Sequence, residues 1–163
     1  MTLLSRQSLF SVSEIELVYR NKVSPIDRPK IKSAASAYDI LVHAWDMNKI
    51  ELVEQFMILL LDRSNACLGV SHISTGGISA CLADPKIIFG TALKARASGI
   101  ILAHNHPSLN LRPSEEDLNV TRRLYEGSKL LDINVLDHLI VTPHKYYSFM
   151  EEGLRYPFNN LSP

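Results

Sequence analysis

Two histidines and an aspartate near the middle of the sequence have the chemistry of metal ligands. His104 and His106 stand one residue apart at the end of an apolar stretch that starts at Gly99, and Asp117 follows after a loop with two prolines. Because side chains on one face of a strand repeat every two residues, a strand here would project both imidazoles from the same face. Two nitrogens and one carboxylate oxygen form the ligand set of a catalytic zinc ion, which keeps a fourth position for water. The sequence therefore predicts a zinc site at His104, His106 and Asp117.

Ser114 and Asp117 also have an interpretation that needs no metal. A serine followed three residues later by an acidic residue is close to a capping box, in which the two side chains satisfy free amide groups at a helix start. Such a cap does not account for two histidines in register or for the prolines between them and the helix. We therefore favour the metal site and keep the cap as a further role for Ser114.

The spacing across this stretch is similar to a known signature. His104 and His106 are followed after seven residues by Ser114 and after two more by Asp117. This pattern resembles the JAMM motif of the MPN metalloprotease domains.

The surrounding chain resembles the bacterial RadC family. The segments that carry the resemblance are His-Asn-His-Pro-Ser from His104, Leu-Asp-His-Leu-Ile-Val over residues 136–141, and Glu-Gln-Phe with an apolar run over residues 54–61. The resemblance covers residues 50–154. The loop over residues 109–112 lacks the glycine that RadC proteins commonly carry there.

The resemblance implies a zinc-dependent hydrolase, a metallopeptidase or isopeptidase that acts on a protein or peptide substrate with a zinc-activated water. The family pattern falls on Glu54 as the general base, which takes a proton from water and returns it to the leaving amine. Glu51, three residues earlier, is the competing candidate, and an ordinary glutamate at a strand edge is the alternative to both. The motif serine, Ser114, is expected to cap its helix and to donate a hydrogen bond to the oxyanion.

A second function, from another class, is an accessory protein in DNA repair or genome maintenance with a structural or vestigial zinc. The 17 basic and 17 acidic residues give a net charge of +0, so DNA binding would need a local patch. Residues 20–32 form the one basic cluster, and we expect a solvated edge or linker there, held extended by Pro25 and Pro29. A zinc deaminase would need H-x-E and P-C-x-x-C motifs, which the sequence lacks.

Other polar residues near the motif are expected to be structural. His138 is a candidate fourth ligand, but a fourth protein ligand would occupy the position of the water, so we disfavour it. Asn105 lies between the two histidine ligands and must face the other way on a strand, where it would form structural hydrogen bonds. Three further histidines have no partner at a meaningful spacing: His43, His72 and His144.

Composition places the chain among ordinary globular proteins. Its 163 residues, 46% hydrophobic and 21% charged, suit one domain. The longest apolar run, residues 56–61, is far short of the about 20 residues that span a bilayer, and residues 1–13 lack the apolar region of a secretory signal. We therefore expect a cytoplasmic protein without membrane contact, in which Cys67 and Cys81 stay reduced as small buried side chains.

The pattern of elements predicts an α/β fold with a mixed central sheet flanked by helices, as in the MPN (JAB) domain and with a layout related to the cytidine deaminases. Residues 1–32 are expected to form an N-terminal segment with a strand and the basic stretch, and residues 33–163 the RadC-like domain, all in one folded unit. The expected strands are 14–21, 55–61, 66–74, 99–104, 134–141 and 145–150. The expected helices are 33–46, a second from the cap Asp84 to just before Gly99, and 114–131.

Overall fold

One mixed sheet of five strands forms the centre of the molecule in the computed structural model, which describes residues 23–78 and 81–154. The strands are β1 (Gln55–Leu61), β2 (Cys67–Thr75), β3 (Gly99–Asn105), β4 (Asn134–Val141) and β5 (Tyr146–Ser148). Their order is β2-β1-β3-β4-β5; β3 and β4 are parallel, and the other neighbours are antiparallel. The predicted fold class is confirmed. The strand expected over residues 14–21 lies outside the described residues.

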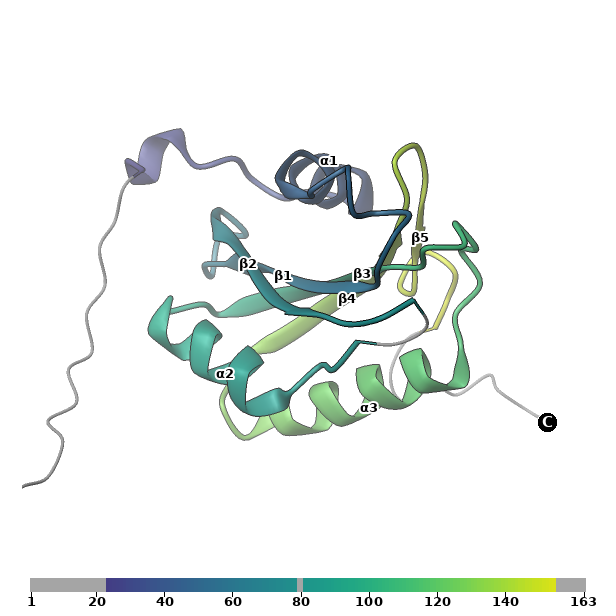
Figure 1. Ribbon diagram of the computed structural model, residues 1–163. Helices are drawn as coiled ribbons and strands as arrows, with labels where there is room; N and C mark the ends of the chain where they lie inside the picture. The colour runs from purple at the N-terminus through teal and green to yellow at the C-terminus, as the bar shows by residue number, and fades with distance from the viewer. Residues whose placement is uncertain (1–22, 79–80, 155–163) are drawn as a thin grey trace, which may run out of the picture.

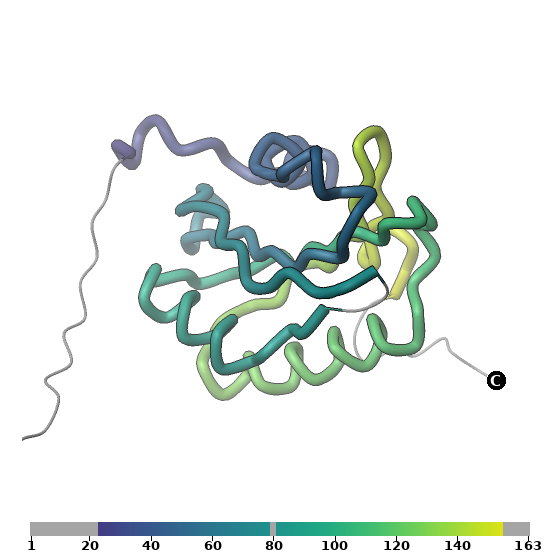
Figure 2. The backbone as a smooth tube through the Cα atoms, in the orientation of Figure 1, coloured from purple at the N-terminus to yellow at the C-terminus, as the bar shows by residue number. Residues whose placement is uncertain are grey.

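Helices cover both faces of this sheet, which gives three layers. α1 (Ala34–Ala44) lies over one face, and α2 (Pro85–Lys94) and α3 (Glu115–Lys129) lie over the other (Figure 1). The tube view shows the same three layers, with the two parallel strands β3 and β4 joined through α3 (Figure 2). No helix among the described residues is long and apolar enough to cross a membrane.

β1 is buried along its whole length because it lies between these layers. Its side chains alternate between two hydrophobic cores, as the two-residue repeat of a strand requires. The core beneath α1 takes Met57, Leu59 and Leu61. The core beneath α2 and α3 takes Phe56, Ile58 and Leu60.

The end of α2 differs from the prediction. Asp84 caps the helix start as expected, but the helix ends at Lys94, before Gly99 is reached. Arg96 adopts a left-handed conformation with φ of 59° and stops the helix there. Gly99 is the first residue of β3, as expected, and a Cβ atom there would lie 3.0 Å from the side chain of Leu136. Gly99 therefore permits close approach of β3 and β4.

The described part of the basic segment packs beside the β1–β2 hairpin. Pro25–Asp27 form a short 3₁₀ turn, so the extended chain predicted there is wrong for these residues. From Pro29 the chain is extended and pairs with the hairpin, with a bridge between Lys30 and Ala66. Lys30 and Lys32 are exposed, as expected of a solvated edge.

Asn105 joins the end of β3 to the segment that leads into β1. Its side-chain amide donates to the carbonyl oxygens of Ile50 (2.6 Å) and Val53 (2.9 Å). Its Oδ1 accepts from the backbone N–H of Gln55 at 2.8 Å. The side chain is fully buried and makes the structural hydrogen bonds expected from the sequence. Because Glu54 lies between Val53 and Gln55, these bonds also fix the backbone that carries Glu54.

We predict that Asn105→Ala lowers the free energy of unfolding by roughly 2–4 kcal/mol, because three buried backbone groups lose their partner. Chemical denaturation of the metal-free protein measures this change. Asn48→Ala, which removes an exposed amide, is the matched control and should change the free energy little. Equal effects of the two substitutions would contradict a structural role of Asn105.

Candidate metal centre

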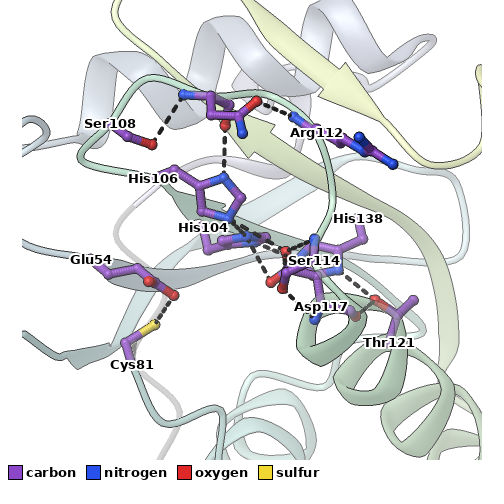
Figure 3. A network of polar contacts seen from close by, with 11 residues as sticks. Glu54, Cys81, His104, His106, Ser108, Arg112, Ser114, Asp117, Thr121 and His138 are labelled. Carbon is purple, nitrogen blue, oxygen red and sulfur yellow. Dashed lines mark hydrogen bonds and ion pairs between the residues drawn. The ribbon is translucent and has the colours of Figure 1, made fainter. Parts of the chain in front are cut away.

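The three predicted ligands converge at the point where β3 ends and α3 begins (Figure 3). His104 Nε2 lies 3.0 Å from His106 Nε2 and 3.0 Å from Asp117 Oδ1. His106 Nε2 lies 3.4 Å from Asp117 Oδ2. The ligand atoms of the three residues are all within 4.8 Å of one another, and no other group of this kind occurs among the described residues. The remaining histidines of the sequence analysis are outside this group: His43, His72, His138 and His144.

The predicted helix cap is present together with this cluster. Ser114 Oγ accepts from the backbone N–H of Asp117 at 3.1 Å, and Asp117 Oδ2 accepts from the backbone N–H of Ser114 at 2.7 Å. The Ser114 hydroxyl also donates to Asp117 Oδ2 at 2.8 Å. The cap orients the carboxylate toward the histidines, so the two interpretations of Ser114 and Asp117 are compatible.

Electrostatics favour the ionised form of Asp117. Burial opposes ionisation, but the imidazoles of His104 and His106 outweigh it and hold the pKa of the Asp117 carboxyl well below its usual range. The bond to the same carboxylate raises the pKa of His106, against the effect of burial. Without a metal, the carboxylate therefore attracts a proton to His106. A cation in the cluster would replace that proton.

The loop after β3 fixes the ring of His106. His106 Nδ1 lies 2.7 Å from the carbonyl oxygen of Asn110, which can only accept, so Nδ1 carries the proton and donates it. Nε2 is then the nitrogen that faces Asp117 and that a metal ion would bind. The loop reaches this conformation through Leu109, whose φ of 59° is left-handed although no glycine is present. That conformation costs about 1–2 kcal/mol for a residue with a Cβ atom.

His138 lies behind His104 rather than among the ligands. Its Nε2 is 2.8 Å from His104 Nδ1, and its Nδ1 is 2.6 Å from the hydroxyl of Thr121. Both ring nitrogens are thus engaged away from the convergence point, which agrees with the expectation that His138 is not a fourth ligand. Complete burial, with His104 beside it, holds the pKa of His138 well below its usual range, so the ring is neutral.

The residues present fit a divalent cation such as zinc. The outer nitrogens of His104 and His106 both have partners, and their Nε2 atoms face each other at 3.0 Å beside a carboxylate. Two lone pairs and an anionic oxygen at this separation repel one another unless a positive charge lies between them. An N₂O donor set of this kind is typical of catalytic zinc sites.

Glu54 lies at the side of this cluster, one residue before β1. It borders an open hollow that His106 and Glu51 also line. Figure 3 shows the Glu54 carboxylate turned toward the side on which His104 and His106 lie. The charge of Glu54 contributes to the raised pKa of His106. Glu51 is exposed on the rim of the same hollow.

Cys81 contacts Glu54, a pairing that the sequence analysis did not predict. Its thiol donates to Glu54 Oε1 at 3.4 Å. Cys67 is buried as expected, whereas Cys81 is only half-buried. Burial and the neighbouring Glu54 carboxylate raise the pKa of Cys81 to about 12. The thiol is therefore protonated at neutral pH and acts as a hydrogen-bond donor to Glu54. The two residues lie in separate loops, so their spacing in the sequence could not predict this contact, and only the structure shows it.

We predict that the purified chain binds about one equivalent of zinc, the stoichiometry of a single catalytic site. His106→Ala should lose most of this metal because it removes a ligand, and metal analysis by mass spectrometry measures the content. His144→Ala, which removes an exposed histidine outside the cluster, should retain it. Full occupancy in His104→Ala, His106→Ala and Asp117→Ala alike would rule out the ligand set.

The contact between Cys81 and Glu54 predicts slow alkylation of Cys81 at pH 8, because a thiol with a pKa of about 12 has almost no thiolate there. Glu54→Gln removes the neighbouring negative charge, so it should lower the pKa and speed the reaction at Cys81. Peptide mapping after timed iodoacetamide treatment gives the rate at Cys81, and a free cysteine in the same buffer is the reference. Glu51→Gln is the matched control. Alkylation of Cys81 at the rate of a free thiol in the unsubstituted chain would contradict the described environment.

Comparison with known proteins identifies the family of the chain. The family model of the RadC-like JAB domain matches residues 31–154. A UPF0758 protein of Flavobacterium johnsoniae is 42% identical over 101 residues, which are 62% of this chain and 44% of the relative. A UPF0758 protein of Desulfitobacterium hafniense is 38% identical over 130 residues, 80% of this chain and 56% of the relative. The chain thus spans about half the length of the curated relatives it matches. It belongs to the RadC-like JAB domain family.

Proposed function

We propose that the chain is a zinc-dependent hydrolase of the JAMM type that cleaves an amide or isopeptide bond in a protein or peptide. The observation that carries the proposal is the convergence of His104 Nε2, His106 Nε2 and the Asp117 carboxylate. The JAB family, which includes JAMM metalloisopeptidases, supports the choice of reaction.

His104, His106 and Asp117 would hold the zinc ion. Bound there, zinc would lower the pKa of a water molecule to about 7 and polarise a carbonyl group. Glu54 is the group placed to accept the proton of that water and to return it to the leaving amine. The thiol of Cys81 occupies Oε1 of Glu54, which leaves Oε2 for proton transfer.

Ser114 is proposed to donate a hydrogen bond to the oxyanion that forms during attack. Its hydroxyl donates to Asp117 Oδ2, so the hydroxyl must rotate before it can donate elsewhere. The backbone N–H of Asp117 still donates to Ser114 Oγ after such a rotation, because it needs only a lone pair. Ser114 can therefore change its donor direction while it keeps the helix cap.

The hollow beside Glu54 supports a peptide-like substrate. It is open to solvent and is lined by residues from the segment before β1, from the loop after β2 and from the loop after β3: Glu51, Glu54, Ile78, His106, Pro107 and Ser108. An extended chain could lie across this opening and bring one amide group next to both Glu54 and His106.

We predict that Glu54→Gln retains zinc and lowers hydrolysis by about 10²- to 10⁴-fold, the usual contribution of general acid–base catalysis. The substitution keeps the shape of the side chain and removes the proton acceptor. Turnover on a panel of peptides and isopeptide-linked substrates, beside zinc analysis of the same samples, measures both quantities.

Glu51→Gln is the matched control and should change neither quantity. Loss of zinc from Glu54→Gln would make Glu54 a ligand. Loss of activity in Glu51→Gln with full activity in Glu54→Gln would move the base to Glu51. A zinc-loaded unsubstituted chain that hydrolyses no member of the panel would argue against the proposed function itself.

A further inference from the structure

We propose that Thr121 and His138 are positioning residues that set the tautomer of His104 and so keep His104 Nε2 free to bind metal. The inference rests on the metal site of the proposed function. It assigns a role to two residues outside the ligand set. They belong to a chain of hydrogen bonds in which each donor and each acceptor is fixed. Figure 3 shows this chain running from the first turns of α3 through His138 to His104.

Thr121, one turn after Asp117 in α3, fixes the order of donors and acceptors in this hydrogen-bond chain. Thr121 Oγ1 lies 2.6 Å from the backbone carbonyl oxygen of Asp117 and 2.6 Å from His138 Nδ1. A carbonyl oxygen cannot donate, so a contact this short needs the hydroxyl proton between the two oxygens. The hydroxyl has only that one proton. Thr121 must therefore act as acceptor toward His138.

His138 donates through one ring nitrogen and accepts through the other. Because Thr121 accepts, His138 Nδ1 carries a proton and donates it. The ring is buried, with 1% of its surface exposed, and burial disfavours the charged form of an imidazole. A neutral imidazole carries one N–H proton only. His138 Nε2 is therefore an acceptor. Its nearest polar partner is His104 Nδ1 at 2.8 Å, so that nitrogen must be the donor.

His104 therefore carries a proton on Nδ1, which leaves Nε2 as the ring nitrogen that can bind a metal ion. Nε2 is the atom that faces Asp117 and His106. The opposite direction would place a proton on Nε2, where it would block a metal ion. It would also leave two oxygen lone pairs facing each other at 2.6 Å between Thr121 and Asp117.

The fold holds the ring of His138 in this position. The ring stacks on Phe149, with centroids 4.7 Å apart, and lies 5.8 Å from Phe56. In the parallel pair of β3 and β4, His138 is opposite Leu102, the residue two before His104 and on the same face. α3 thus supplies one ligand through Asp117 and orients another through Thr121.

The experiment compares Thr121→Val with Thr121→Ser in the full chain. Valine has the shape of threonine without the hydroxyl, whereas serine keeps the hydroxyl. Zinc affinity is measured by competition with a chromophoric chelator, and two-bond ¹H–¹⁵N spectra of the metal-free protein report the tautomer of His104. Thr121→Val should weaken zinc binding by roughly 10- to 100-fold, the usual effect of a lost partner behind a ligand. It should also mix the His104 tautomers, and Thr121→Ser should restore both readouts.

Ser128→Ala is the matched control. Ser128 is a buried hydroxyl on the same helix that also donates to a helical carbonyl, that of Tyr125. Its loss should change neither zinc affinity nor the tautomer. His138→Phe keeps an aromatic ring against Phe149 and removes both nitrogens, so it should weaken zinc binding even if Thr121→Val fails to fold.

Two results would overturn the inference. One is a folded Thr121→Val or His138→Phe chain that binds zinc as tightly as the unsubstituted chain. The other is a His104 ring that carries no proton on Nδ1 in the metal-free unsubstituted chain. If the unsubstituted chain binds no zinc, the proposed function fails, and the tautomer spectra still decide the direction of the hydrogen-bond chain.

Discussion

The alternation of side chains along β3 is the constraint on which the whole site depends. His104 faces the layer formed by α2 and α3, in which Asp117 lies, and His138 of β4 turns to the same side. Asn105, the next residue, faces the layer of α1 and holds the segment that carries Glu54. Ligand and base are thus fixed from opposite faces of one buried strand. A shift of one residue in the register of β3 would exchange these faces and dismantle both arrangements.

Three residues at the start of α3, within two helical turns, each position part of the site. Ser114 closes the helix end, Asp117 shares its carboxylate between that cap and the histidines, and Thr121 fixes the ring behind them. A buried carboxylate is costly unless it is hydrogen-bonded and paired with opposite charge. The backbone amide and hydroxyl of Ser114 supply the hydrogen bonds, and a proton on His106, or a cation in its place, supplies the charge. The residues that stabilise the helix end therefore also stabilise the ionised ligand.

Features set by local spacing could be predicted from the sequence. The strand pair β1 and β2, the cap at Ser114 and the convergence of His104 with His106 depend on residues close in the chain, whose periodicity is visible. The predicted end of α2 was wrong because Arg96 adopts the left-handed conformation that ends the helix, although arginine has no special preference for it. The turn at Pro25–Asp27 was missed for a similar reason, since proline permits both extended and 3₁₀ chain.

Contacts between distant segments could not be predicted in the same way. The contact of Thr121 with His138 depends on the pairing of β3 with β4 beneath α3, which brings two segments together that are 17 residues apart in the chain. Cys81 meets Glu54 because a loop after β2 returns to the start of β1. The segment around His138 can be recognised in the sequence as a pattern. The position of its ring relative to His104 cannot be predicted from that pattern.

The ligand set spans two elements, because His104 belongs to β3 and Asp117 to α3, with the loop of His106 between them. An ion held by all three would act as a cross-link between strand and helix and would bind the folded chain far better than the unfolded one. By mass action, such an ion stabilises the fold by about 2.7 kcal/mol when its free concentration is a hundred times the dissociation constant. The midpoint of thermal unfolding would then rise with free metal concentration. Apparent stability would thus become a property of the metal supply as well as of the sequence.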